Sequence, residues 1–108
     1  MKAKPYKITD AGGYTPCKAS EATHVELHMP GPISFRMLPV IIKGERRGTP
    51  CWTWNGEVDF PTLKPSILST GGGTGTRCHS FVNDGRVQFL TDTTHEFSGM
   101  TVDLLEVE

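Results

Sequence analysis

The amino-acid sequence predicts an all-β protein, a small β-sandwich or barrel-like sheet of short antiparallel strands. Twelve glycines and eight prolines leave little uninterrupted sequence for helices. Several short segments alternate apolar and polar residues with the two-residue period of a strand. A chain of 108 residues is long enough for one modest core, so we expect residues 1–108 to form a single domain.

Two segments in the first half of the chain are predicted strands. At residues 24–28, three polar residues alternate with Val25 and Leu27, which is the pattern of a half-buried strand. Residues 33–42 are the most apolar stretch, and Pro39 within it favours an edge strand or two short strands.

The middle of the chain is expected to be extended. Trp52 and Trp54 lie two residues apart, so they share one face of a short strand. Two prolines hold residues 61–66 out of the helical region, because a proline restricts the residue before it. We expect an exposed turn at residues 44–50 and a glycine-rich connector at residues 71–76.

An Asn-Asp-Gly turn at residues 83–85 is the clearest hairpin signal. A three-residue turn pairs Phe81 with Val87 and gathers the apolar residues of the hairpin on one face, whereas a two-residue turn would mix polar and apolar residues on both faces. We therefore predict the three-residue turn. In that register His79 points into the apolar face and Cys78 points the opposite way.

Residues 93–98 are predicted to form one short helical turn. Asp92 or Thr93 is the expected N-cap, and Glu96 follows Thr93 at the spacing of a capping box. Gly99 is the expected left-handed stop.

The composition argues against several classes of function. A net charge of −1 gives no general attraction for nucleic acid or for a membrane surface. No apolar run approaches the ~20 residues of a membrane helix, and the first residues lack the apolar segment of a signal peptide. Three widely spaced cysteines do not suggest a disulfide framework. We expect a cytoplasmic protein that acts without a membrane or nucleic-acid partner.

Thiol and imidazole groups make zinc the first candidate cofactor, since these are the ligands that a tetrahedral zinc site takes. None of them has the spacing of a recognised zinc motif, and buried thiols with hydrogen-bonded core histidines are an alternative explanation. The candidate zinc ligands are Cys78, His79, His95, Cys51 and His28.

Nucleophilic catalysis is the second candidate chemistry. Cys78 would be the nucleophile, His95 the base and Asp92 the residue that orients the base. This trio requires the thiol and the imidazole to lie within hydrogen-bond reach, and it requires a lowered thiol pKa.

Partner binding is the third candidate. Trp52, Trp54 and Phe60, beside an extended proline segment, could form an aromatic groove to which a partner protein adds.

Four motifs resemble a family of small proteins that is frequent in phages and prophages and whose function is unassigned. They are W-T-W-N-G at 52–56, P-T-L-K-P-S at 61–66, C-H-S-F-V-N-D-G-R-V-Q-F-L at 78–90 and D-T-T-H-E-F-S-G-M-T-V-D-L at 92–104. The resemblance implies a zinc-ribbon-like site, because relatives carry an upstream Cys-Pro-x-Cys cluster with a nearby histidine. Met29, Pro32 and Arg36 stand where those ligands would be.

From this resemblance we expect a phage or prophage accessory protein. It would be a non-enzymatic module that binds a host or phage protein, for example to antagonise a host defence factor. The alternative is a zinc-binding or thiol-dependent hydrolase that uses Cys78, His79 and His95.

Overall fold

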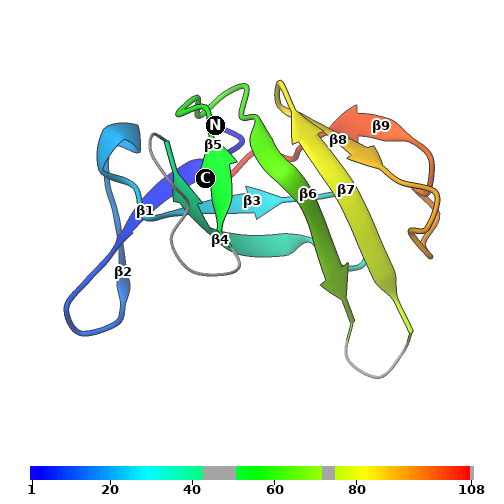
Figure 1. The fold of residues 1–108 in the computed structure, drawn as a ribbon, viewed down its shortest axis with the longest axis horizontal. Helices are drawn as coiled ribbons and strands as arrows, with labels where there is room; N and C mark the ends of the chain where they lie inside the picture. Colours follow the sequence, from blue (N-terminus) through cyan, green and yellow to red (C-terminus); the bar gives the residue numbers. More distant parts are fainter. Residues whose placement is uncertain (43–50, 72–74, 108) are drawn as a thin grey trace.

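A computed structural model describes residues 1–42, 51–71 and 75–107. These residues form one nine-stranded sheet, mostly antiparallel, in the order β2-β1-β3-β4-β5-β6-β7-β8-β9 (Figure 1). The strands are β1 (Lys4–Ile8), β2 (Tyr14–Pro16), β3 (His24–His28), β4 (Phe35–Ile41), β5 (Trp52–Trp54), β6 (Leu63–Thr70), β7 (Arg77–Asn83), β8 (Arg86–Phe89) and β9 (Thr101–Asp103). Of these, β4 and β5 pair in parallel. The predicted all-β class is confirmed.

The sheet bends over itself, so that β3 and β4 cross behind β6 and β7 (Figure 1). One core fills the space between the two layers. Val25 and Leu27 enter it from β3, and Trp54, Leu63 and Phe89 enter it from the other layer, each at most 1% exposed. The alternation predicted at residues 24–28 is therefore observed, with Val25 and Leu27 facing inward.

The predicted turn at residues 44–50 and the centre of the predicted connector, residues 72–74, lie outside the described residues. Within the described part of the chain, no helix is long and apolar enough to cross a membrane.

The β7–β8 hairpin has a two-residue turn, so the predicted three-residue register is wrong. Asp84 and Gly85 both have positive φ, +51° and +76°, as a type I′ turn requires. Phe81 faces Gln88 across the hairpin, and Val82 faces Val87. Val82 and Val87 are at most 1% exposed, so this register buries a valine pair that the three-residue turn would separate.

This register reverses the predicted faces of the Cys-His pair. Cys78 points into the core and is 1% exposed, whereas His79 lies on the outer face of the sheet. Of this pair, the side chain available on the outer face is therefore the imidazole of His79.

The predicted helical turn at residues 93–98 is also wrong, because this segment forms hydrogen-bonded turns. Ser98 N–H donates to the His95 carbonyl at 3.1 Å, and Met100 N–H donates to the Phe97 carbonyl at 2.9 Å. Thr93, an expected cap, bonds to β7 instead of starting a helix. In the described residues the helical element is a 3-10 turn at Ala19–Glu21. Gly99 has the expected left-handed conformation, with φ +79°.

Candidate active site

A bulge in β6 places Ser66 on the outer face of the sheet. The β6–β7 ladder pairs Leu63 with Val82 and then Ile67 with Ser80, so three residues on β6 oppose one residue on β7. The bulge contains Pro65, which has no N–H to donate to a ladder. Bulges of this kind redirect side chains and are frequent beside active sites.

Ser66 is also held from the core side. The buried Trp52 indole Nε1–H donates to the Ser66 carbonyl oxygen at 3.2 Å. Trp52 is 9% exposed, so a rigid side chain fixes the backbone at the bulge.

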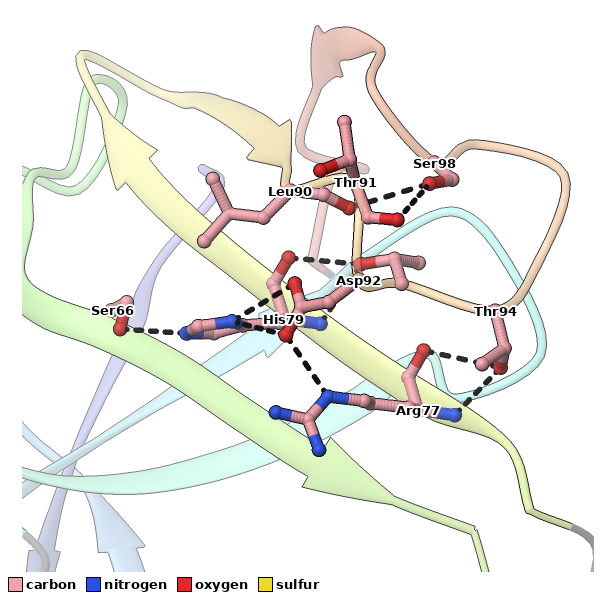
Figure 2. Close-up of polar contacts among 9 residues, drawn as sticks. Ser66, Arg77, His79, Leu90, Thr91, Asp92, Thr94 and Ser98 are labelled. Atoms are coloured by element: carbon pink, nitrogen blue, oxygen red, sulfur yellow. Dashed lines mark hydrogen bonds and ion pairs between the residues drawn. The ribbon is translucent and has the colours of Figure 1, made fainter.

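His79 connects Ser66 to Asp92 (Figure 2). Ser66 Oγ and His79 Nε2 are 2.9 Å apart. On the other side of the ring, His79 Nδ1 lies 3.1 Å from Asp92 Oδ1 and 3.0 Å from Oδ2. The three side chains come from β6, β7 and the turn that follows β8, and they form one hydrogen-bonded series.

The pKa of the Asp92 carboxyl is lowered from its ordinary value. Partial desolvation alone would raise this pKa, but hydrogen bonds and charges from His79 and Arg77 together lower it by more. Arg77 Nε donates to Asp92 Oδ2 at 3.0 Å. An ionised Asp92 accepts a hydrogen bond from His79 Nδ1–H, and this tautomer leaves Nε2 free to accept the Ser66 hydroxyl proton.

Thr93 joins the Asp92 turn to the backbone of His79. Its Oγ1 accepts the His79 N–H at 3.0 Å and donates to the His79 carbonyl at 3.0 Å. Thr93 is 5% exposed, so these bonds are shielded from water. The Leu90 N–H also donates to the His79 carbonyl at 2.8 Å.

A second threonine, Thr94, connects the turn to β7 in the same way, through the backbone of Arg77. The Arg77 N–H donates to Thr94 Oγ1 at 2.8 Å (Figure 2). The Thr94 N–H donates to the Arg77 carbonyl at 2.9 Å. The turn therefore pairs with β7 much as a neighbouring strand would, which fixes Asp92 against the imidazole.

Two surface depressions lie on this face of the sheet, and the first of them includes His79 and Asp92 of the series. One has a volume of about 450 Å³ and is lined by His79, Gln88, Phe89, Leu90, Thr91, Asp92 and Gly99. The other has a volume of about 270 Å³ and is lined by Thr62, Leu63, Lys64, Phe81, Val82, Asn83 and Gln88. Both include Gln88, so they adjoin on the outer face.

The structure distributes the predicted thiol trio differently. Asp92 pairs with His79, and Cys78 lies in the core, where burial raises the pKa of its thiol although the nearby Arg36 partly offsets this. His95 packs edge-on against Phe89 with ring centroids 4.9 Å apart. A raised thiol pKa is the opposite of what an activated cysteine nucleophile needs.

His28 and Cys51, two further predicted zinc ligands, lie elsewhere. His28 Nε2 pairs with the Glu26 carboxylate, and Cys51 is a half-buried free cysteine. Among residues 1–42, 51–71 and 75–107, no group of three His, Cys, Asp or Glu side chains is placed to hold a metal ion. A zinc ion at these residues stays a prediction.

The three residues of the predicted aromatic groove are split between core and surface. Trp52 and Trp54 face inward, at 9% and 1% exposed, while Phe60 is 57% exposed. The two indoles therefore support the sheet from within.

Ser66 is the candidate functional residue that the sequence interpretation missed. The available signal was the order Ser66, His79, Asp92 inside one compact segment, with the serine directly after a proline in an extended stretch. Serine is common and polar, so this signal is weak without the register that brings Ser66 to His79.

A hydroxyl, an imidazole and an ionised carboxylate hydrogen-bonded in this order have the geometry of a serine-hydrolase triad. The comparison with protein families agrees with this class. The model of the family described as bacterial ubiquitination-like system serine protease (BubE) matches residues 34–90, more than half of the chain. The chain belongs to this family.

The family match includes Ser66 and His79 and ends two residues before Asp92. Comparison of the chain with curated proteins and with solved structures finds no match.

The family match corrects two expectations. The chain's family is described as a serine protease family, so the expected resemblance to phage and prophage proteins of unassigned function is wrong. The expected non-enzymatic binding module is likewise wrong, and the hydrolase alternative is closer. That alternative named a thiol and zinc, whereas the residue bonded to His79 Nε2 is the Ser66 hydroxyl.

Proposed function

We propose that the chain is a serine protease that hydrolyses amide bonds through an acyl-enzyme formed at Ser66. The observation that carries the proposal is the continuous hydrogen-bonded series Ser66–His79–Asp92, with distances of 2.9 Å and 3.0–3.1 Å. Membership of the bacterial ubiquitination-like system serine protease family supports the same reaction. We propose a protein of such a system as the substrate.

In the first half of the reaction, Ser66 Oγ attacks the carbonyl carbon of the scissile bond and its proton moves to His79 Nε2. Asp92 accepts the hydrogen bond of His79 Nδ1–H and stabilises the imidazolium that results. The C–N bond then breaks, and His79 gives the proton to the leaving amine. The acyl group is left as an ester on Ser66.

In the second half, His79 accepts a proton from a water molecule, whose oxygen attacks the ester carbon. The ester C–O bond breaks, and the proton returns to Ser66 Oγ. The product is a free carboxylic acid and the enzyme regains its starting state.

Arg77 contributes by its charge rather than by touching the reacting atoms. Its guanidinium holds one oxygen of Asp92 and keeps that carboxylate ionised, so Asp92 accepts a hydrogen bond from His79 rather than donating one. The tautomer of His79 that can receive the serine proton follows from this.

A fluorophosphonate probe tests the proposal, because it labels serines that are activated by a neighbouring base. We expect one labelled site, at Ser66, located by mass spectrometry of peptides. Ser66→Ala should abolish labelling and lower hydrolysis by at least about 10⁴-fold. Ser69→Ala, three residues further along β6, is the matched control and should keep both. Labelling that survives in Ser66→Ala would refute the assignment of the nucleophile.

A further inference from the structure

Two side chains, Leu68 and Phe81, flank the Ser66–His79 hydrogen bond on the outer face of β6 and β7. Leu68 pairs directly with His79 in the ladder. Ser66 lies in the bulge between the Leu63–Val82 and Ile67–Ser80 pairs, where Phe81 is the residue opposite on β7. The hydrogen bond from Ser66 to His79 thus runs along one diagonal of a four-residue square. Leu68 and Phe81 occupy the two other corners.

Leu68 and Phe81 are exposed although they lie on interior strands of the sheet. Leu68 is 49% and Phe81 is 43% exposed, while their inward neighbours Ile67 and Val82 are each 1% exposed. The inward positions already supply the apolar burial of these strands. The outward pair therefore presents accessible apolar surface directly beside the nucleophile and its base.

We propose that Phe81 and Leu68 determine substrate specificity by binding apolar side chains on the two sides of the scissile bond. Phe81 contacts the acyl side and Leu68 the leaving-group side. The proposal rests on the proposed function of Ser66 as nucleophile, and it adds the chemical class of residues that the enzyme accepts.

The two sides follow from the chemistry of the triad. The acyl group is bonded to Ser66 Oγ after the first step, and Ser66 lies opposite Phe81. The leaving amine receives its proton from His79 Nε2, and His79 lies opposite Leu68. Cross-strand neighbours lie about 4.5–5.5 Å apart, closer than residues two apart on one strand, which are about 6.8 Å apart. Phe81 is therefore nearer to the acyl fragment and Leu68 is nearer to the leaving amine.

A depression beside Phe81 can receive the acyl-side residue. It has a volume of about 270 Å³, and its lining includes Phe81, Leu63, Lys64 and Gln88. The lining also includes the polar residues Thr62 and Asn83, so the apolar contact in this depression comes mainly from Phe81, which is 43% exposed. An aliphatic or aromatic substrate side chain that packs against the Phe81 ring gains by burying apolar surface.

The test is digestion of a mixed peptide library, with cleavage sites read by mass spectrometry. We expect the wild-type protein to cleave between apolar residues. Phe81→Ala should reduce the preference for apolar over polar residues on the acyl side by at least about tenfold and leave the other side unchanged. Leu68→Ala should reduce the preference for apolar residues on the leaving-group side and leave the acyl side unchanged. Phe35→Ala, which removes an exposed aromatic on β4, is the matched control and should change neither preference.

Fluorophosphonate labelling of the same samples separates the possible failures. If Ser66 is labelled but Phe81→Ala lowers all cleavage equally, or wild type shows no apolar preference, the specificity proposal is overturned and the nucleophile stands. Labelling of Ser66 without cleavage of any peptide would likewise overturn the specificity proposal and leave Ser66 as the nucleophile. If wild-type Ser66 is not labelled, the proposed function fails, and the specificity proposal fails with it.

Discussion

Replacing Thr93 by valine tests whether the Asp92 turn is fixed through the backbone of His79. Valine has the shape of threonine but no hydroxyl, so the His79 N–H loses its acceptor in a buried position. The His79 carbonyl loses one donor and keeps the Leu90 N–H. The substitution thus removes two hydrogen bonds and leaves one buried donor unpaired.

The expected loss of stability can be worked out from these bonds. A buried donor left unpaired costs about 1–3 kcal/mol, and we take about 2 kcal/mol. An unfolding entropy of about 2.1 cal/mol/K per residue gives about 0.23 kcal/mol/K for 108 residues. The Tm should therefore fall by about 9 °C.

Calorimetry measures the Tm, and steady-state hydrolysis measures the effect on the triad. We expect Thr93→Val to lower kcat more than it raises KM, because Thr93 positions the His79–Asp92 pair rather than the substrate. Thr93→Ser keeps the hydroxyl and should restore most of both properties. A Thr93→Val protein with the wild-type Tm and kcat would refute the inferred role of this bridge.

Three further predictions concern neighbouring groups. The pKa of Asp92 is lowered in the folded protein, so its contribution to stability is present above the ordinary value of 3.8 and is lost as pH falls through the lower folded value. Arg77→Gln removes part of the cause of this shift and should flatten the dependence of Tm on pH between about 5 and 2. An unchanged profile would contradict this. Cys78→Ala should keep fluorophosphonate labelling and hydrolysis, whereas loss of activity in the folded variant would favour a thiol nucleophile. Gly31→Ala would place a Cβ 3.3 Å from the His95 ring at a φ of +112°, so denaturant unfolding should show a loss of about 1–3 kcal/mol, and an unchanged midpoint would argue against this contact.

The fold class could be predicted because it depends on local signals. Alternation at residues 24–28 and the proline and glycine content indicate strands wherever they occur, and the structure contains them. The hairpin register could not be predicted the same way, because maximal separation of polar and apolar residues favoured the wrong turn. Burial of Val82 against Val87 and the twist of the type I′ turn outweigh the exposure of Phe81.

The candidate site was predicted only in part for the same reason. His79 and Asp92 were recognised as chemically capable residues. The wrong register placed His79 on the inner face, and Asp92 was assigned to orient His95 instead. Ser66 joins them only through the β6 bulge, and a bulge is a property of the pairing between two strands rather than of either sequence. Distances across strands are fixed by register, so a one-residue error exchanges the residues of the two faces.

The triad is built almost entirely from cross-strand neighbours, and this explains how a small sheet can hold it although the described residues include no long helix. Ser66 and His79 lie on adjacent strands, and their inward neighbours Ile67 and Ser80 form the ladder pair that locks the register from the core side. Asp92 completes the series because the turn after β8 pairs with β7 through threonine hydroxyls. Ladder pairing thus supplies the rigidity that aligns nucleophile, base and carboxylate, and the outward residues between them stay free to meet a substrate.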